Sequence, residues 1–263
     1  MLAYRELVRF FRQRNRVIGA VGQPILFWLL FGAGLQQSFR PVTREGNSLS
    51  FLAYYYPGTL VLILLFTAIF TTISVIEDRR EGFLQAVLVA PVPRWAMVMG
   101  KVLGGALIAT LQASFFLVFA LTLQVPIDPL GMVALISFLF VSAVGLTALG
   151  LLFAWRMEST QGFHAIMNLV LMPMWLLSGA FFPVPATHSG ASWSQVVLQV
   201  VMLINPVSYC VAGARRLLFP AADLEGLWAP SLWVCWPLTM VSATLLVAMA
   251  CWIARKNTTG DLL

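Results

Sequence analysis

The sequence contains little charge for its length. Asp, Glu, Lys and Arg make up 10% of its 263 residues, and hydrophobic residues make up 60%. Soluble domains carry about 25% charged residues, so this composition excludes an ordinary soluble domain. We therefore predict an integral membrane protein.

The sequence also lacks the motifs of nucleotide-binding proteins and enzymes. Its only Gly-Lys pair, Gly100–Lys101, has no glycine at the upstream loop position and is followed by valine, so no phosphate-binding loop is present. His164 and His188 have no Cys, Asp or Glu at metal-ligand spacing. We predict no catalytic residue, metal site, cofactor or nucleic-acid partner for this chain, and we expect His164 to be a helix-end residue rather than a proton relay.

Cysteine is scarce as well. Cys210, Cys235 and Cys251 have no paired or metal-like spacing. We expect them to be small apolar residues in or near the bilayer. A disulfide between Cys210 and Cys235 remains open if both face outside.

Long uncharged runs predict six transmembrane helices, because about 20 residues cross the hydrocarbon core. Pro24 and Pro173 should bend two of them. The predicted spans are 17–39, 57–76, 102–125, 130–154, 161–182 and 231–254, and none contains Asp, Glu, Lys or Arg. The expected fold is a single all-α transmembrane domain over residues 1–263.

The region 183–230 is ambiguous, because residues 159–214 carry no charge and are long enough for two crossings. Gln195, Gln199 and Pro206 interrupt its apolar pieces. We predict short external helices that form a re-entrant or capping region. A further span through 191–214 remains open.

Residues 1–16 are predicted to form an amphipathic helix on the membrane surface. A basic face lies beside an apolar face that contains Tyr4, Leu7, Val8 and Phe11. Such a helix binds anionic lipid headgroups. The basic residues at helical spacing are Arg5, Arg9, Arg12 and Arg16.

The distribution of Lys and Arg predicts the orientation. Twelve lie in the N-terminal segment, the 77–101 loop, the 155–160 loop and the C-terminal tail, and four lie on the opposite side. Both termini and the 77–101 loop should therefore face the cytoplasm. The run Tyr54–Tyr56 suits the aromatic belt at the other membrane interface.

The loop 77–101 is the candidate functional segment. It holds seven of the chain's 26 charged residues between two uncharged runs. Its middle, 83–90, predicts a short amphipathic helix that ends at Pro91 and Pro93. We interpret this helix as a docking surface for another protein. Gly100, Gly104 and Gly105 follow it and permit close helix packing.

Three ordered features resemble the membrane subunits of type-2 ABC exporters, the ABC-2 permease family. The first is the basic amphipathic N-terminus. The second is Glu77–Gln85 followed by Ala90–Arg94 and Gly100–Lys101. The third is the sequence LSGAFFP at 177–183 followed by LINPVSY at 203–209. The chain has Leu84–Gln85 where family members commonly have Leu-Glu, which puts a salt bridge from that position in doubt.

The resemblance implies a permease subunit in the bacterial inner membrane. It would pair with a second copy or a homologous permease, and two ABC ATPase subunits carrying ATP and Mg would drive it. The residues implied to couple to the ATPase are Glu77, Asp78, Arg79, Arg80, Glu81, Gly82 and Arg94. Those implied to cap the exit are Ser178, Gly179, Phe182, Pro183, Asn205, Pro206 and Tyr209.

Two other functions remain open. A membrane-embedded lipid-modifying enzyme would need convergent polar groups such as the carboxylates of 77–81. A partner-free channel or carrier would need no ATPase. The aromatic and Met content of the spans favours a hydrophobic drug-like or lipid-linked glycan cargo.

Overall fold

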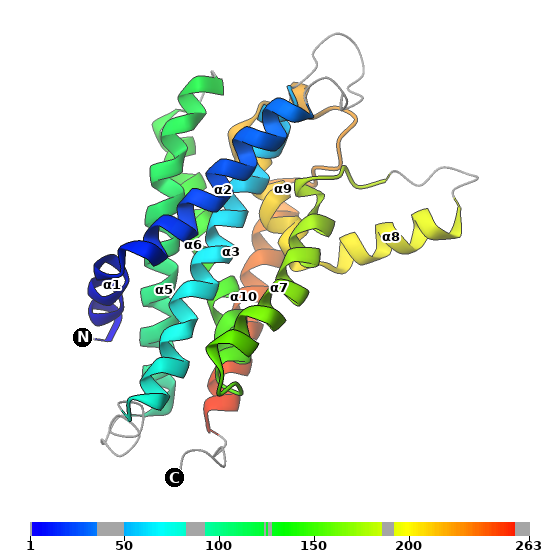
Figure 1. Ribbon diagram of the computed structural model, residues 1–263. Coiled ribbons are helices and arrows are strands. Elements are labelled where there is room, and N and C mark those ends of the chain that lie inside the picture. Colours follow the sequence, from blue (N-terminus) through cyan, green and yellow to red (C-terminus); the bar gives the residue numbers. More distant parts are fainter. Residues whose placement is uncertain are drawn as a thin grey trace.

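The computed structural model describes residues 2–35, 50–82, 93–123, 125, 128–185 and 192–255, and these ranges contain helices and no strand (Figure 1). The long elements are α1 Leu2–Arg12, α2 Arg14–Gly34, α3 Phe51–Arg80, α5 Arg94–Phe116, α6 Pro129–Ala154, α7 Thr160–Trp175, α8 Trp193–Ile204, α9 Pro206–Leu218 and α10 Leu232–Arg255. The short elements are η1 Leu117–Leu123, the π-helical turn η2 Leu176–Ala180, and η3 Ala221–Leu224.

Six helices of the described chain are long and apolar enough to cross a membrane. This number confirms the predicted fold class. The candidate spans are Val17–Gly34, Phe51–Arg80, Arg94–Leu123, Pro129–Ala154, Thr160–Ala180 and Leu232–Arg255.

Helix α3 forms the centre of the bundle and contacts α2, α5, α6, α7 and α9. Its most apolar stretch is 94% buried, compared with 22% for α2 and α10. It is longer than the predicted span 57–76, because Ser50 caps its start and it continues to Arg80. With about 1.5 Å per residue, its 30 residues extend about 45 Å.

The prediction of a membrane-interface belt for Tyr54–Tyr56 is wrong. All three side chains are at most 1% exposed. The hydroxyl of Tyr54 donates to the carbonyl of Gly179 at 2.9 Å, and that of Tyr56 donates to the carbonyl of Phe116 at 2.9 Å. The rings are buried because α3 is the central helix, so neighbouring elements enclose even its first turn.

Two of the glycines that follow the charged loop permit close helix packing. A Cβ atom at Gly104 would lie 3.2 Å from the Cα atom of Ala3 in α1. A Cβ atom at Gly105 would lie 2.7 Å from Cγ2 of Thr147 in α6. The absence of a side chain at these positions lets α5 pack tightly between its neighbours.

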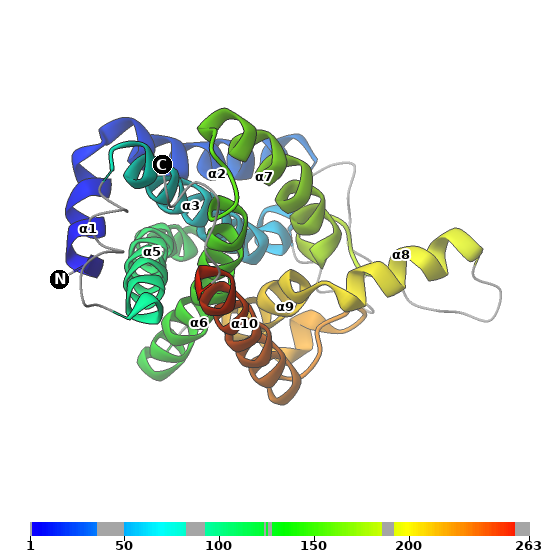
Figure 2. The same cartoon turned by 90° about the horizontal axis from the view of Figure 1, so that it is seen from below.

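The region between α7 and α10 contains two short helices that meet at Asn205 with a bend of 76°. Helix α8 projects away from the bundle in both views, whereas α9 packs against α6 and α10 (Figure 1 and Figure 2). Such a bend fits a broken span or a re-entrant loop. The external location of this region stays a prediction.

The remaining predictions concern cysteines and prolines. The three cysteines are free thiols, and Cys210 and Cys235 are buried. Helix α2 continues through Pro24, whereas Pro173 lies three residues before the first residue of the π-helical turn η2. His164, in α7, packs its ring against Phe70 with ring centroids 5.9 Å apart.

Candidate functional site

The described part of the predicted coupling loop consists of the last turn of α3 and the start of α5. Residues 83–92, which contain the predicted amphipathic helix, lie outside the described residues. That helix stays a prediction. The residues that flank it, however, are placed, and they contact three other helices.

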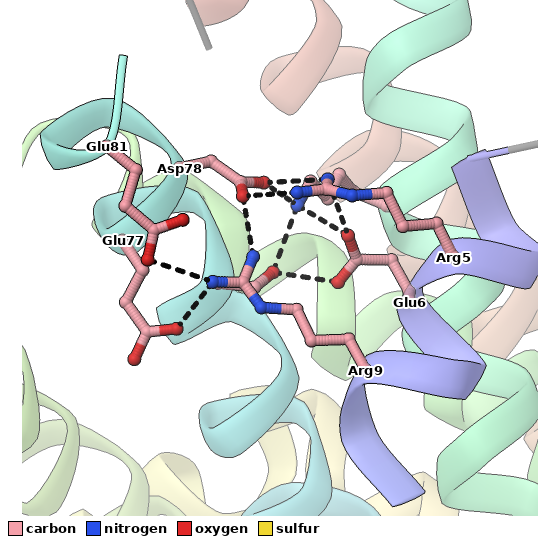
Figure 3. A network of polar contacts seen from close by, with 8 residues as sticks. Arg5, Glu6, Arg9, Glu77, Asp78 and Glu81 are labelled. Carbon is pink, nitrogen blue, oxygen red and sulfur yellow. Dashed lines mark hydrogen bonds and ion pairs between the residues drawn. The ribbon is translucent and has the colours of Figure 1, made fainter. Parts of the chain in front are cut away.

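A cluster of charged side chains joins α1, α3 and α5, and we call it the ion cluster (Figure 3). Its members are Arg5, Glu6, Arg9, Ser74, Glu77, Asp78 and Lys101. Asp78 is fully buried at its centre. Its carboxylate accepts hydrogen bonds from Arg5 at 2.9 Å, Arg9 at 2.5 Å and Lys101 at 2.5 Å.

Glu6 is the second buried carboxylate of the ion cluster. It accepts from Lys101 at 2.7 Å and from the hydroxyl of Ser74 at 2.9 Å. With Glu77, the cluster's hydrogen-bonded members include three acids and three bases, whose formal charges cancel. The exposed Glu81 adds a fourth acid at the edge, 3.7 Å from Arg9 (Figure 3). A buried ion that loses its partner costs several kcal/mol, and the buried ions of this cluster are all paired and hydrogen-bonded.

The basic face of α1 is divided between two environments. Arg5 and Arg9 bond to Asp78 rather than pointing towards lipid headgroups, whereas Arg12 is exposed. Burial lowers the pKa of Arg9, but its attraction to Asp78 and Glu77 raises it more, so its net pKa is above the ordinary value. The side chain of Arg16 lies outside the described residues.

Arg79 and Arg80 bond to backbone carbonyls that follow α6. Arg79 donates to Trp155 at 2.6 Å and to Met157 at 3.2 Å. Arg80 donates to Glu158 at 3.1 Å. Cations are favourable beside unpaired carbonyls at a helix C-terminus. These two predicted coupling residues therefore fix the end of α3 to the end of α6.

Arg94 makes a similar connection from the start of α5. It donates to the carbonyls of Ala254 and Arg255 at the end of α10, at 3.1 and 3.2 Å. Glu81 is 63% exposed and lies 3.7 Å from Arg9, and Gly82 has a φ of +74° that favours glycine. Among the described coupling residues, Glu81 and Arg80 are therefore the ones exposed to a partner.

The opposite end of α3 carries a second polar group, the arginine cluster, which consists of Tyr54, Gly179 and Arg215. Arg215 is 2% exposed, donates to the carbonyl of Gly179 at 2.8 Å, and lies 4.4 Å from the ring centroid of Tyr54. In the described chain, no carboxylate forms an ion pair with it. Carbonyl dipoles and the face of an aromatic ring stabilise this cation.

The sequence patterns did not predict Arg215 as a site residue; it was counted only as a charge on the outer side. A signal was available, because it directly follows the uncharged run 159–214. A charged residue next to membrane segments is a candidate for function.

The predicted capping motif is partly assembled around Asn205. Its amide donates to the carbonyls of Met174 at 2.5 Å and Leu177 at 3.2 Å, and its Oδ1 accepts from the backbone N–H of Val207 at 3.0 Å. Ser178 donates to the carbonyl of Trp175 at 2.5 Å. Asn205 thus satisfies carbonyls at the π-helical turn and caps α9 in one place.

The other motif residues lie around this centre. Pro206 is the first residue of α9, where its missing N–H costs nothing, and the Tyr209 hydroxyl donates to the carbonyl of Leu203 at 2.9 Å. Phe182 and Pro183 are exposed and do not join the contacts of Asn205.

Comparison with known proteins agrees with this arrangement. The family model described as ABC-2 type transporter matches residues 1–219. A putative transport permease, ycf38, from Cyanophora paradoxa is 27% identical over 220 residues, which are 82% of this chain and 72% of that protein. The probable multidrug ABC transporter permease YbhR from Escherichia coli is 28% identical over 72% of this chain and 48% of its own length. The daunorubicin resistance ABC transporter permease protein DrrB1 from Streptomyces coeruleorubidus is 27% identical over 94% of this chain and 81% of its own length.

Proposed function

The chain belongs to the ABC-2 type transporter family, and we propose that, as the transmembrane subunit of an ABC exporter, it forms half of a pathway driven by two cytoplasmic ATPase subunits. The other half is a second copy or a homologous permease. ATP and Mg bind to the ATPase, and this chain catalyses no reaction itself. It lies in a bacterial inner membrane with both termini in the cytoplasm.

The observation that supports coupling at 77–94 is how its two flanks are anchored. Asp78 bonds to α1, Arg79 bonds to the end of α6, and Arg94 bonds to the end of α10. A force on the intervening residues 83–92 would therefore reach three helices and α3 itself. Packed helices transmit such displacements because close-packed interiors deform little.

The cargo is proposed to be a hydrophobic drug-like or lipid-linked compound. The printed names of YbhR and DrrB1 refer to multidrug transport and daunorubicin resistance, respectively. The spans of this chain are apolar and rich in aromatic side chains, which suits lipophilic molecules.

Co-purification from the native membrane tests the ATPase partnership. The tagged chain should bring down an ABC ATPase in equal amount, and the double variant Arg80→Ala/Glu81→Ala should release most of it, because these side chains are exposed beside the proposed docking helix. Arg156→Ala is the matched control, since Arg156 is exposed beyond the end of α6. Equal membrane levels of all three forms show that insertion is intact.

Two outcomes would contradict the proposal. A chain that purifies alone and supports cargo flux without any ATPase would be a channel or carrier. Turnover of a lipid by the purified chain alone would identify a membrane enzyme.

A further inference from the structure

An apolar groove runs between α2 and α5 and begins where α1 meets α2. Its volume is about 660 Å³. Its lining residues include Phe11, Ile18, Gly22, Ile25, Leu111 and Phe115. Both walls belong to candidate membrane spans, so its surroundings are lipid chains rather than water.

A second, basic groove of about 410 Å³ lies along α1, lined in part by Arg12 and Gln13. Phe11 of the apolar groove directly precedes Arg12 in the chain, so the two grooves occupy neighbouring faces at the end of α1. Arg12 is exposed and forms no hydrogen bond or ion pair within the described chain. The Oε1 atom of Gln13 is buried without a hydrogen-bond partner.

We propose that these two grooves form a specific site for one anionic phospholipid. An acyl chain lies in the apolar groove between α2 and α5, and the phosphate lies beside Arg12. Charge complementarity supports this occupant, because Arg12 is an exposed cation without a partner in the described chain, one residue from Phe11 of the apolar groove. Basic side chains at the membrane surface attract anionic headgroups.

Another apolar face provides an internal comparison. Helix α10 exposes Trp233, Val241 and Trp252 at 90%, 54% and 54%. The apolar stretches of α10 and α2 are equally buried, 22% each, so we expect ordinary surrounding lipid to contact both helices to a similar extent. A specific site must therefore bind lipid more strongly than α10 does, and this difference can be measured.

Photolabelling tests the acyl-chain part of the site. The full chain is reconstituted in phosphatidylcholine vesicles that contain a small fraction of phosphatidylglycerol with a diazirine in its acyl chain. Mass spectrometry of the peptides then locates the label. We expect labelling of 17–25 and 111–115 to exceed that of α10 several-fold. Equal labelling of both regions would overturn the proposal, because the groove would then bind lipid no better than an ordinary surface.

A pair of glycine variants supplies the control. A Cβ atom at Gly22 would meet only Cγ2 of Ile18, at 3.8 Å, and one at Gly34 would meet nothing within 4 Å. Both positions should therefore accept a larger side chain. Gly22→Phe fills the groove and should reduce its labelling to the level of α10, whereas Gly34→Phe, on the same helix but outside the groove, should not. An unchanged label in Gly22→Phe would contradict the proposal.

The headgroup part is tested with Arg12→Gln. This variant should reduce the preference for phosphatidylglycerol over phosphatidylcholine probes several-fold, and Arg156→Gln should not. An unchanged preference would show that Arg12 does not bind the phosphate.

Gln112 distinguishes a lipid chain from a polar ligand. It lines the groove, its Oε1 accepts from Thr67 at 2.5 Å, and its Nε2 has no partner. Thr67 also bonds to the carbonyl of Ile63 at 2.7 Å, so Gln112→Leu leaves its hydroxyl bonded. An acyl chain needs no polar partner, so labelling should persist in Gln112→Leu. Loss of labelling would overturn the lipid proposal in favour of a ligand with a polar group.

Discussion

The two ends of α3 bury positive charge in different ways. Near its C-terminal end, Lys101 lies between the carboxylates of Glu6 and Asp78. Near its N-terminal end, about 36 Å away along the helix, Arg215 contacts a carbonyl and the ring of Tyr54, with no carboxylate paired to it in the described chain. Formal negative charges stabilise Lys101, whereas a carbonyl dipole and the face of an aromatic ring stabilise Arg215.

This difference shows what each end can tolerate. In the ion cluster the charges compensate one another, so loss of the buried central carboxylate of Asp78 leaves buried cations incompletely paired. In the arginine cluster, loss of the cation leaves only neutral groups. We therefore expect the free energy of unfolding to depend more strongly on a single carboxylate than on Arg215. The predictions below test that order.

Asp78→Ala should have the largest effect, a loss of about 3–5 kcal/mol in the free energy of unfolding. The substitution leaves Lys101 with one carboxylate and removes the buried carboxylate that Arg5 and Arg9 share, although Arg9 keeps its bond to Glu77. The change in the free energy of unfolding is measured by titrating the detergent-solubilised protein with a denaturing detergent.

A double-mutant cycle attributes this loss to charge rather than to shape. Asp78→Asn and Lys101→Met should each lower the free energy of unfolding. The double variant should lose about 2 kcal/mol less than the sum of the two single losses, because each substitution removes the charge that the other leaves without its partner. Additive effects would show that the ion pair at 2.5 Å carries no coupling energy.

Arg215→Met should cost less, about 2–3 kcal/mol, which is the range for a hydrogen bond to a charged donor combined with a cation–π contact. Arg215→Lys should lose nearly as much, because an ammonium cannot reproduce the planar contact with Tyr54. The same titration measures both. If Arg215→Met is as costly as Asp78→Ala, the proposed contrast between the two ends is wrong.

The sequence predicted the number of spans because each is a long uncharged run. It also indicated 77–82 and Asn205 as candidate site residues, because charged residues and a helix-breaking Asn-Pro pair interrupt those uncharged runs. It did not predict the pairing of α1 with Asp78, because α1 and Asp78 are far apart in the chain and only tertiary packing joins them. The predicted lipid-facing role of Arg5 and the membrane-interface role of Tyr54 took no account of such long-range contacts.

Gly179→Ala should cost about 1–2 kcal/mol, because Gly179 has a φ of +77° that an L-residue with a side chain adopts only with strain. The added Cβ would also lie 3.3 Å from Cγ2 of Val184. Denaturant titration measures the loss. Gly34→Ala is the control, since its Cβ meets nothing within 4 Å. A loss at Gly179 no larger than at Gly34 would show that the π-helical turn carries no strain.

Glu77→Gln should have the smallest effect, below about 1 kcal/mol, although Glu77 belongs to the same ion cluster as Asp78. Its side chain is 24% exposed and bonds to Arg9 at 3.0 Å, whereas the side chain of Asp78 is 1% exposed. Water and salt screen this partly exposed pair more than a buried one, so the small loss should shrink further at high ionic strength. The loss caused by Asp78→Ala should persist there, because dissolved ions do not reach a buried carboxylate. Equal salt dependence of the two losses would mean that burial does not separate these two carboxylates.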